Sequence, residues 1–191
     1  NAGHPYSFSK VLAEKKAWEM NKAQDRWQLV TINPSLVLGP GINPKATSES
    51  FNIVKQIGNG DMKMGVPDFH IGTVDVRDVA SAHYQAAFNP EAKGRYIVSA
   101  ENISMLDLSQ MLQDDFGKEY PLPKKMLPKW LVWLAAPMSG LKRNFVSNNI
   151  GYPFNADNSK GKKDLGLEYL SIKKSINDMF GQLAESGQLK K

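Results

Sequence analysis

The sequence has no cysteine and only three histidines among its 191 residues. The lack of cysteine excludes disulfide bonds, a thiol nucleophile and thiolate metal sites, and it is compatible with a reducing cytoplasm. His4, His70 and His83 stand far apart, without the spacing of a zinc site. We therefore expect no metal centre and a cytoplasmic location.

The sequence also lacks a long hydrophobic run and a strongly charged block. Its longest apolar stretch, residues 130–138, is far shorter than the roughly 20 residues that span a membrane. The formal net charge is +5, and the lysines are scattered rather than interleaved with aromatic residues. We expect these lysines to be solvated surface, with no nucleic-acid partner and no membrane partner.

Several enzyme motifs are missing as well. Gly39-Pro40-Gly41 and Gly58-Asn59-Gly60 do not have the third glycine of a dinucleotide-binding loop, nor the strand before it and the helix after it. There is no nucleophile elbow, Walker sequence or paired-carboxylate motif. The sequence therefore lacks the glycine-rich half of a dinucleotide site and can offer only the other half.

One pair of residues that is present indicates proton-transfer chemistry. Tyr6 and Lys10 are four positions apart in a segment, about 5–24, that is predicted to be a helix, so both side chains leave one face about a turn apart. A unit charge at about 4 Å is worth about 4 kcal/mol at an effective dielectric near 20, so the ammonium favours the phenolate form. Tyr6 would then suit general acid or base catalysis.

The spacing alone is not specific, because it recurs in the pairs Tyr120 with Lys124 and Tyr169 with Lys173. Two prolines inside the first of these pairs exclude a helix there. Ser171 is a predicted helix N-cap inside the second, which leaves Tyr169 in the preceding turn. After Tyr6, by contrast, no glycine or proline occurs until Pro34.

The rest of the chain alternates predicted strands and helices, which indicates an open α/β sheet. The predicted strands are residues 27–32, 69–74 and 94–99, and the predicted helices are residues 49–58, 75–88, 105–116 and 171–184. Residues 33–41 are predicted to be a loop at the carboxyl end of a strand, and residues 144–158 to be irregular. On the helix 75–88, His83 shares a face with Val76, Val79 and Ala80, so we expect it at the edge of the core.

The apolar residues 130–138 predict a short helix that is apolar nearly all round. Two interpretations remain open for it. It is either a packing element or a lid or wall over an apolar pocket, because such pockets are largely apolar.

Three ordered segments together resemble a known family: Tyr6-Ser7-Phe8-Ser9-Lys10 with Ala13-Glu14, Asn33-Pro34-Ser35-Leu36-Val37-Leu38-Gly39-Pro40, and Val74-Asp75-Val76-Arg77-Asp78-Val79-Ala80 followed by Gly94-Arg95-Tyr96. They are similar to the extended short-chain dehydrogenase/reductases, most of all the dihydroflavonol reductase-like branch near the NAD-dependent epimerase/dehydratases. The resemblance covers nearly the whole chain in the right order.

The resemblance implies a role for five residues. Tyr6 would give a proton to a carbonyl oxygen as hydride arrives, and Lys10 would assist it and hold the nicotinamide ribose. Pro34 and Ser35 match the loop whose backbone lies beside the nicotinamide, and Ser50 matches a serine near the cofactor phosphates. The cofactor implied is NADP or NAD, with NADP favoured, and the substrate is a small carbonyl compound.

The resemblance also implies an architecture, the C-terminal part of a Rossmann-like doubly wound sheet with a small mixed substrate-binding domain. Residues 1–45 would belong to the dinucleotide-binding domain, 46–70 to an excursion into the substrate domain, 71–100 to a return to the sheet, and 101–191 mostly to the substrate domain. The family's glycine-rich loop and catalytic serine would lie before Asn1, so we expect the chain alone to be inactive and to bind cofactor immeasurably weakly.

Three functions agree with this pattern. The leading hypothesis is an NAD(P)-dependent reductase of an aldehyde or ketone, such as a dihydroflavonol-like substrate. A sugar-nucleotide epimerase or dehydratase shares the tyrosine and lysine, and a non-catalytic relative could sense dinucleotide. An uncovered sheet edge also predicts a possible homo-oligomer.

Overall fold

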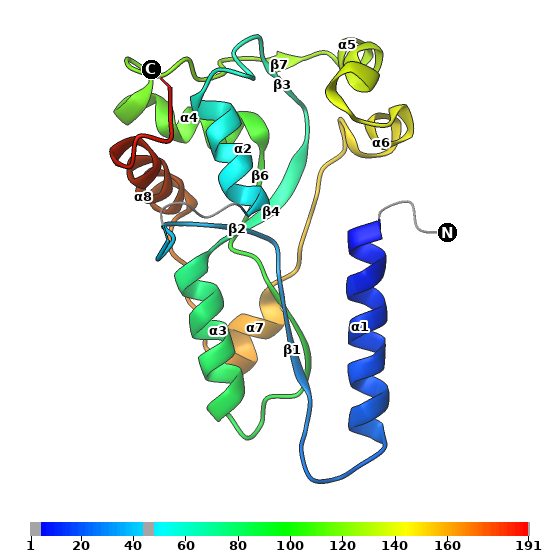
Figure 1. Ribbon diagram of the computed structural model, residues 1–191. Coiled ribbons are helices and arrows are strands. Elements are labelled where there is room, and N and C mark those ends of the chain that lie inside the picture. Colours follow the sequence, from blue (N-terminus) through cyan, green and yellow to red (C-terminus); the bar gives the residue numbers. More distant parts are fainter. Residues whose placement is uncertain (1–4, 44–47, 191) are drawn as a thin grey trace.

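The computed structural model describes residues 5–43 and 48–190, so His4 lies outside the described part. The helices are α1 (Pro5–Lys22), α2 (Glu49–Gly58), α3 (Val76–Phe88), α4 (Met105–Phe116), α5 (Lys129–Ala135), the 3-10 helix η1 (Ala136–Ser139), α6 (Arg143–Asn149), α7 (Ser159–Leu165) and α8 (Ile172–Glu185). The strands are β1 (Val30–Pro34), β2 (Leu36–Leu38), β3 (Val66–Pro67), β4 (His70–Asp75), β5 (Gly94–Val98), β6 (Glu101–Ser104) and β7 (Met126–Leu127). The predicted α/β class is confirmed (Figure 1).

Parallel pairing dominates the three small sheets. β1 pairs with β5 in parallel, with Val30 opposite Gly94 and Pro34 opposite Val98. β2 pairs in parallel with β4, which pairs antiparallel with β6, and β3 pairs in parallel with β7. β1 ends where the loop 34–41 begins, β2 lies within that loop, and β4 ends at the start of α3. The carboxyl ends of these strands therefore meet in one region.

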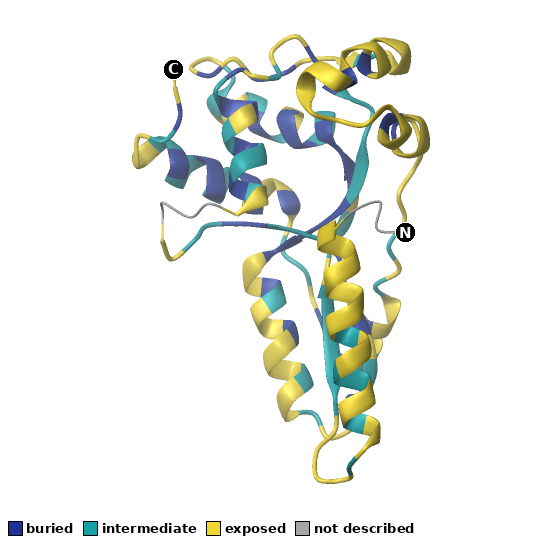
Figure 2. Cartoon of the chain, turned by 45° about the vertical axis from the view of Figure 1, so that its right-hand side comes forward, coloured by how far each residue is buried: buried dark blue, intermediate teal, exposed yellow. Residues whose placement is uncertain are grey.

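Two main apolar cores flank this region. The smaller core lies between the β1–β5 pair and the helices α3 and α7, and it includes Tyr96, Val98 and Leu165. The larger core joins α2, α4 and α8 and includes Phe51 and Phe180, whose ring is fully buried. α1 stands on the side of β1 away from α3 (Figure 1), and none of its described residues is buried, as Figure 2 shows.

The strand predicted at residues 27–32 begins later, at Val30. The reason is that side chains occupy the backbone groups before it. The amide oxygen of Gln24 accepts hydrogen bonds from the N–H groups of Arg26 and Trp27, and Asn21 Oδ1 accepts one from Leu29 at 2.8 Å. Ladder pairing can start only where these local bonds end.

Several short elements were not predicted. β2 interrupts the expected loop 33–41, β6 follows β5 after a turn, and β3 pairs with β7. α6 occurs where irregular chain was expected, and α7 follows directly after that stretch. Tertiary packing explains α6, because Val146 and Ile150 are buried against Val132 and Ala136 of the neighbouring helices. Packing of this kind overrides weak local propensity.

The prediction for His83 was wrong. Its helix buries Asp78 and Ala82, one position away from the expected face, and His83 is exposed. Its Nδ1 lies 2.8 Å from the carbonyl oxygen of Val79. The helix itself was predicted correctly, but its buried face contains the small Ala82 and the carboxylate of Asp78. A pattern of apolar residues does not reveal a buried carboxylate.

Candidate active site

Tyr6 lies in the first turn of α1, as predicted, and its side chain is 66% exposed. One turn later, the Lys10 ammonium lies over the Tyr6 ring, 5.4 Å from the ring centroid. This is a cation–π contact, which attracts the cation to the face of the ring. The structure therefore brings the two predicted residues together on one side of the helix.

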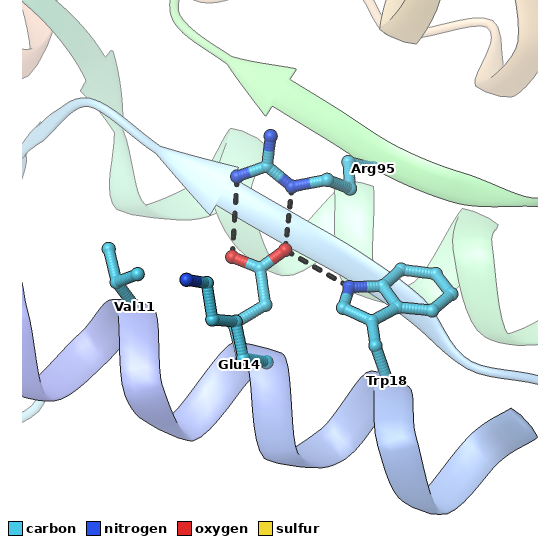
Figure 3. A pocket seen from close by; sticks show the side chains of 5 residues that line it. Val11, Glu14, Trp18 and Arg95 are labelled. Atoms are coloured by element: carbon cyan, nitrogen blue, oxygen red, sulfur yellow. Dashed lines mark hydrogen bonds and ion pairs between the residues drawn. The ribbon is translucent and has the colours of Figure 1, made fainter. Parts of the chain in front are cut away.

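Glu14 holds this helix against the β1–β5 pair. Its carboxylate accepts hydrogen bonds from Arg95 Nε at 2.6 Å and from Trp18 Nε1 at 3.2 Å (Figure 3). The hydrogen bond from Arg95 lowers the pKa of Glu14, burial opposes this, and Trp18 lowers the pKa further. The position of Tyr6 thus depends on an ion pair two turns away, since α1 has no buried residue of its own among those described.

The loop that follows β1 is fixed at three points. Ser35 N–H donates to the carbonyl of Val98 at 3.0 Å, which extends the pairing with β5. Gly39 has a φ of 112°, and a Cβ there would lie 3.1 Å from Asp75 Oδ2, so glycine is required. The side-chain amide of Gln182 in α8 bonds both the N–H and the carbonyl of Gly41, at 2.8 and 2.7 Å.

A hollow of about 580 Å³ opens where these segments meet, and it is lined by Tyr6, the residues 34–41, Ser48, Glu49, Ser50, Phe51 and Val76. Four of the five predicted site residues line it: Tyr6, Pro34, Ser35 and Ser50. Lys10 is not part of the lining and reaches the site through its contact with Tyr6. The hollow thus lies at the carboxyl ends of parallel strands, where open α/β sheets bind ligands.

Ser50 lies in the first turn of α2, whose N-cap is Ser48. The two hydroxyl oxygens are 3.2 Å apart at the edge of the hollow. Ser48 makes no side-chain cap bond, so its hydroxyl does not satisfy the backbone donors of α2. The first turn of a helix carries partial positive charge, which favours an anionic ligand group.

A buried carboxylate supports the wall of the hollow. Asp75 is fully buried, caps α3 through the N–H of Arg77 at 2.7 Å, and pairs with the Arg77 guanidinium at 2.7 Å. Burial opposes the ionisation of Asp75, but hydrogen bonds from Arg77 and Ser175 outweigh it, so its pKa is lowered. Arg77 also pairs with Asp178 at 2.9 Å, which ties α3 to α8.

The sequence prediction missed several residues that shape the site. Gly39, Gly41 and Val76 line the hollow, while Glu14 and Gln182 hold its walls in place. Gly39, Val76 and Glu14 lie inside the motifs that carried the family resemblance, so a local signal existed for them, and Gly41 directly follows one of these motifs. Gln182 is 141 positions from Gly41 and carries no such signal.

Among the described residues, no group of three or more histidine, aspartate or glutamate side chains could hold a metal ion. None of the described helices combines the length and the apolar character that crossing a membrane requires.

The fold and the hollow define an α/β protein with a ligand site at the carboxyl ends of its parallel strands. Residues 1–99 match the NAD dependent epimerase/dehydratase family. Because the match covers more than half of the chain, the chain belongs to this family. The resemblance stated from the sequence is confirmed.

The chain is 32% identical over 186 residues to the NADPH-dependent methylglyoxal reductase GRE2 of Saccharomyces cerevisiae, covering 93% of this chain and 50% of that protein. It is 33% identical over 189 residues to cinnamoyl-CoA reductase 1 of Arabidopsis thaliana, covering 99% and 48%. The crystal structure of Gre2 from Candida albicans superposes with a TM-score of 0.73 at 28% identity, covering 97% of this chain and 54% of that one. The chain thus spans about half the length of the curated relatives it matches.

Proposed function

We propose that the full-length protein is an NADPH-dependent reductase of small carbonyl compounds. The observation that carries this proposal is the placement of Tyr6, with Lys10 on its ring, at a hollow lined by Pro34, Ser35 and Ser50. Relatives that share about a third of the sequence are named as a methylglyoxal reductase and a cinnamoyl-CoA reductase. Both names describe reduction at a carbonyl group.

The residues present suit one end of a dinucleotide. Tyr6, Ser35 and Ser50, which carry hydroxyl groups, line one hollow, and residues 34–41 form one of its walls. Hydroxyls and backbone amides are suitable partners for a ribose and a carboxamide. Pro34 and Ser35 would lie beside the nicotinamide, and Ser50, in the first turn of α2, would lie near phosphate oxygens.

The bound NADPH supplies the hydride. Tyr6 donates its phenolic proton to the carbonyl oxygen, which becomes the hydroxyl oxygen of the product. The positive charge of Lys10 stabilises the phenolate that remains, because a cation near an anion favours the charged form. Lys10 would also hold the ribose of the bound cofactor, so one side chain would bind the cofactor and assist the proton donor.

The domain assignment is part of this proposal. Residues 1–45 and 71–100 belong to the dinucleotide-binding half, and 46–70 with most of 101–191 belong to the substrate half. The packing of α2, α4 and α8 around one apolar core supports the second group. Within 101–191, Leu165 and Leu167 pack on the core of the β1–β5 pair, so this short segment belongs with the first half.

The remaining parts of the proposal concern the cell and the assembly. A chain without cysteine suits the cytoplasm, and we assign the protein to that compartment. We also propose a homo-oligomer, because several large apolar side chains are exposed, among them Phe8 and Leu12 of α1.

The test is a substrate panel on the full-length protein, with NADPH consumption followed by the absorbance of the reduced nicotinamide. We expect NADPH to be consumed in proportion to added methylglyoxal or a cinnamoyl thioester. Conversion of a nucleotide sugar without net NADPH consumption would instead identify an epimerase or dehydratase. NADPH binding without turnover of any substrate would identify a dinucleotide sensor.

A further inference from the structure

The net positive charge of the chain comes from one segment. Residues 120–156 contain no aspartate or glutamate, and they hold five basic residues: Lys124, Lys125, Lys129, Lys142 and Arg143. The chain has 24 basic residues, and the 19 outside this segment equal the 19 acidic residues. The excess of +5 therefore lies within 37 consecutive positions.

Part of this segment folds into a small helical unit, which we call the basic apolar hairpin (residues 129–149, comprising α5, η1 and α6) and which holds three of the five basic residues, Lys129, Lys142 and Arg143. It has its own core, in which Val132, Ala136 and Val146 are buried. Within it, α5 packs on α6. Figure 1 shows the hairpin at the edge of the molecule, away from α8.

Large apolar side chains remain on the outside of the hairpin: Trp130 (65% exposed), Leu131, Trp133, Leu134 (53%), Met138 (92%), Leu141 and Phe145. Lys129, Trp130, Trp133 and Leu134 line an open hollow in this surface. A monomeric protein rarely exposes so many large apolar side chains together unless they bind something. None of the described residues of α5 lines the hollow at Tyr6. This hollow therefore does not support the interpretation of residues 130–138 as a lid over a pocket.

The basic groups lie among these apolar side chains rather than apart from them. The Arg143 guanidinium lies over the Trp133 ring, 4.3 Å from its centroid. Lys129 Nζ donates to the Ser147 carbonyl at 3.0 Å and lies 4.5 Å from the Tyr152 ring centroid. Exposed tryptophan and leucine surrounded by lysine and arginine are typical of surfaces that lie in the interface of an anionic bilayer.

We propose that the basic apolar hairpin binds the surface of an anionic lipid bilayer, in place of the surface without a membrane partner that the scattered lysines predicted. Trp130, Leu134 and Met138 would enter the boundary between headgroups and acyl chains, and Lys142 with Arg143 would contact lipid phosphates. A cluster of cations without any acid in the same segment complements a negatively charged surface. The hairpin would lie on the membrane without crossing it. This proposal does not depend on the reductase activity.

The test is cosedimentation of the full-length protein with vesicles of phosphatidylcholine and phosphatidylserine in a ratio of about four to one. We expect binding to these vesicles, little binding to phosphatidylcholine alone, and weaker binding at high salt. The variant Lys142→Gln/Arg143→Gln should lower the partition coefficient by at least about tenfold, since each basic residue near the surface contributes about fivefold. The variant Trp130→Ser/Leu134→Ser should lower it to a similar extent.

Matched variants control for charge and for exposed apolar area. Lys22→Gln/Lys63→Gln removes the same charge elsewhere, and Trp27→Ser/Ile42→Ser removes exposed apolar side chains outside the hairpin. Both should bind vesicles like the unmodified protein. The proposal is overturned if neutral vesicles bind equally well or if the control variants lose as much binding. It is also overturned if no vesicle binding occurs and the hairpin variants instead reduce the oligomer mass in light scattering, since a second copy would then be the occupant.

Discussion

Tyr6 differs from Tyr120 and Tyr169 in its surroundings, not in its spacing to a lysine. Tyr120 and Tyr169 also have a lysine four positions later, but Tyr120 is buried in the larger core and Tyr169 packs against the smaller one. Burial, with the charge of Asp78, raises the pKa of Tyr169, so this phenol keeps its proton. Only Tyr6 among these three combines a helical lysine partner with exposure at a hollow.

The charge of Lys10 is expected to matter for both catalysis and cofactor binding. In the full-length protein, Lys10→Met should lower kcat for carbonyl reduction by about a hundredfold, because the phenolate would lose the cation that stabilises it. It should also weaken NADPH binding, measured by fluorescence titration, because one hydrogen bond to the ribose is lost.

The matched control is Lys22→Met, which removes an exposed lysine from the last turn of the same helix. Its kcat and its NADPH affinity should equal those of the unmodified protein. Equal losses in the two variants would show that the charge of α1, and not the position of Lys10, governs the rate, and would contradict the assigned role.

At the scale of elements, the helix α1 is the most weakly anchored part of the site. It contributes no buried residue, and the ion pair between Glu14 and Arg95 holds it beside β5. The sequence predicted the helix almost to its ends, because no glycine or proline interrupts it. The pairing with Arg95 could not be predicted, since 81 positions separate the two residues and no sequence pattern links them.

This anchoring predicts a pH dependence. The folded-state pKa of Glu14 is lowered from 4.5, so the ion pair stabilises the docked helix at neutral pH and loses this effect as the pH falls through the folded pKa. Hydrogen exchange, normalised for intrinsic rates, should show α1 losing protection below pH 4.5 before α8 does. Glu14→Gln should expose α1 already at neutral pH, whereas Glu19→Gln in the same helix should not. Protection of α1 that is independent of both pH and Glu14 would refute this anchoring.

Long, periodic elements were predicted best from the sequence. The helices α2, α3, α4 and α8 agree with their predicted spans within about two residues, a usual limit for helix ends. Ser104 caps α4 with the reciprocal bonds of a capping box. The strands β2 and β6 were missed, because three or four residues between turns carry no clear period and form only by pairing with β4.

At the scale of the whole molecule, the candidate site is assembled from separate stretches of chain. The start of α1, the loop after β1, the first turn of α2 and the start of α3 all meet at one hollow. The family resemblance identified four of its lining residues, but the convergence itself depends on sheet pairing and on links such as Gln182 to Gly41. Contacts between distant parts of the chain are where prediction from a single sequence ends.

The role proposed for Tyr6 is to deliver the proton in carbonyl reduction, and the variant Tyr6→Phe of the full-length protein tests this role. This change removes one hydroxyl and keeps the ring under the Lys10 ammonium, so NADPH affinity should stay within about threefold while kcat falls about a hundredfold or more. The control Tyr84→Phe, an exposed tyrosine on α3, should leave both quantities unchanged. Unchanged turnover in Tyr6→Phe, with NADPH still bound, would contradict the account.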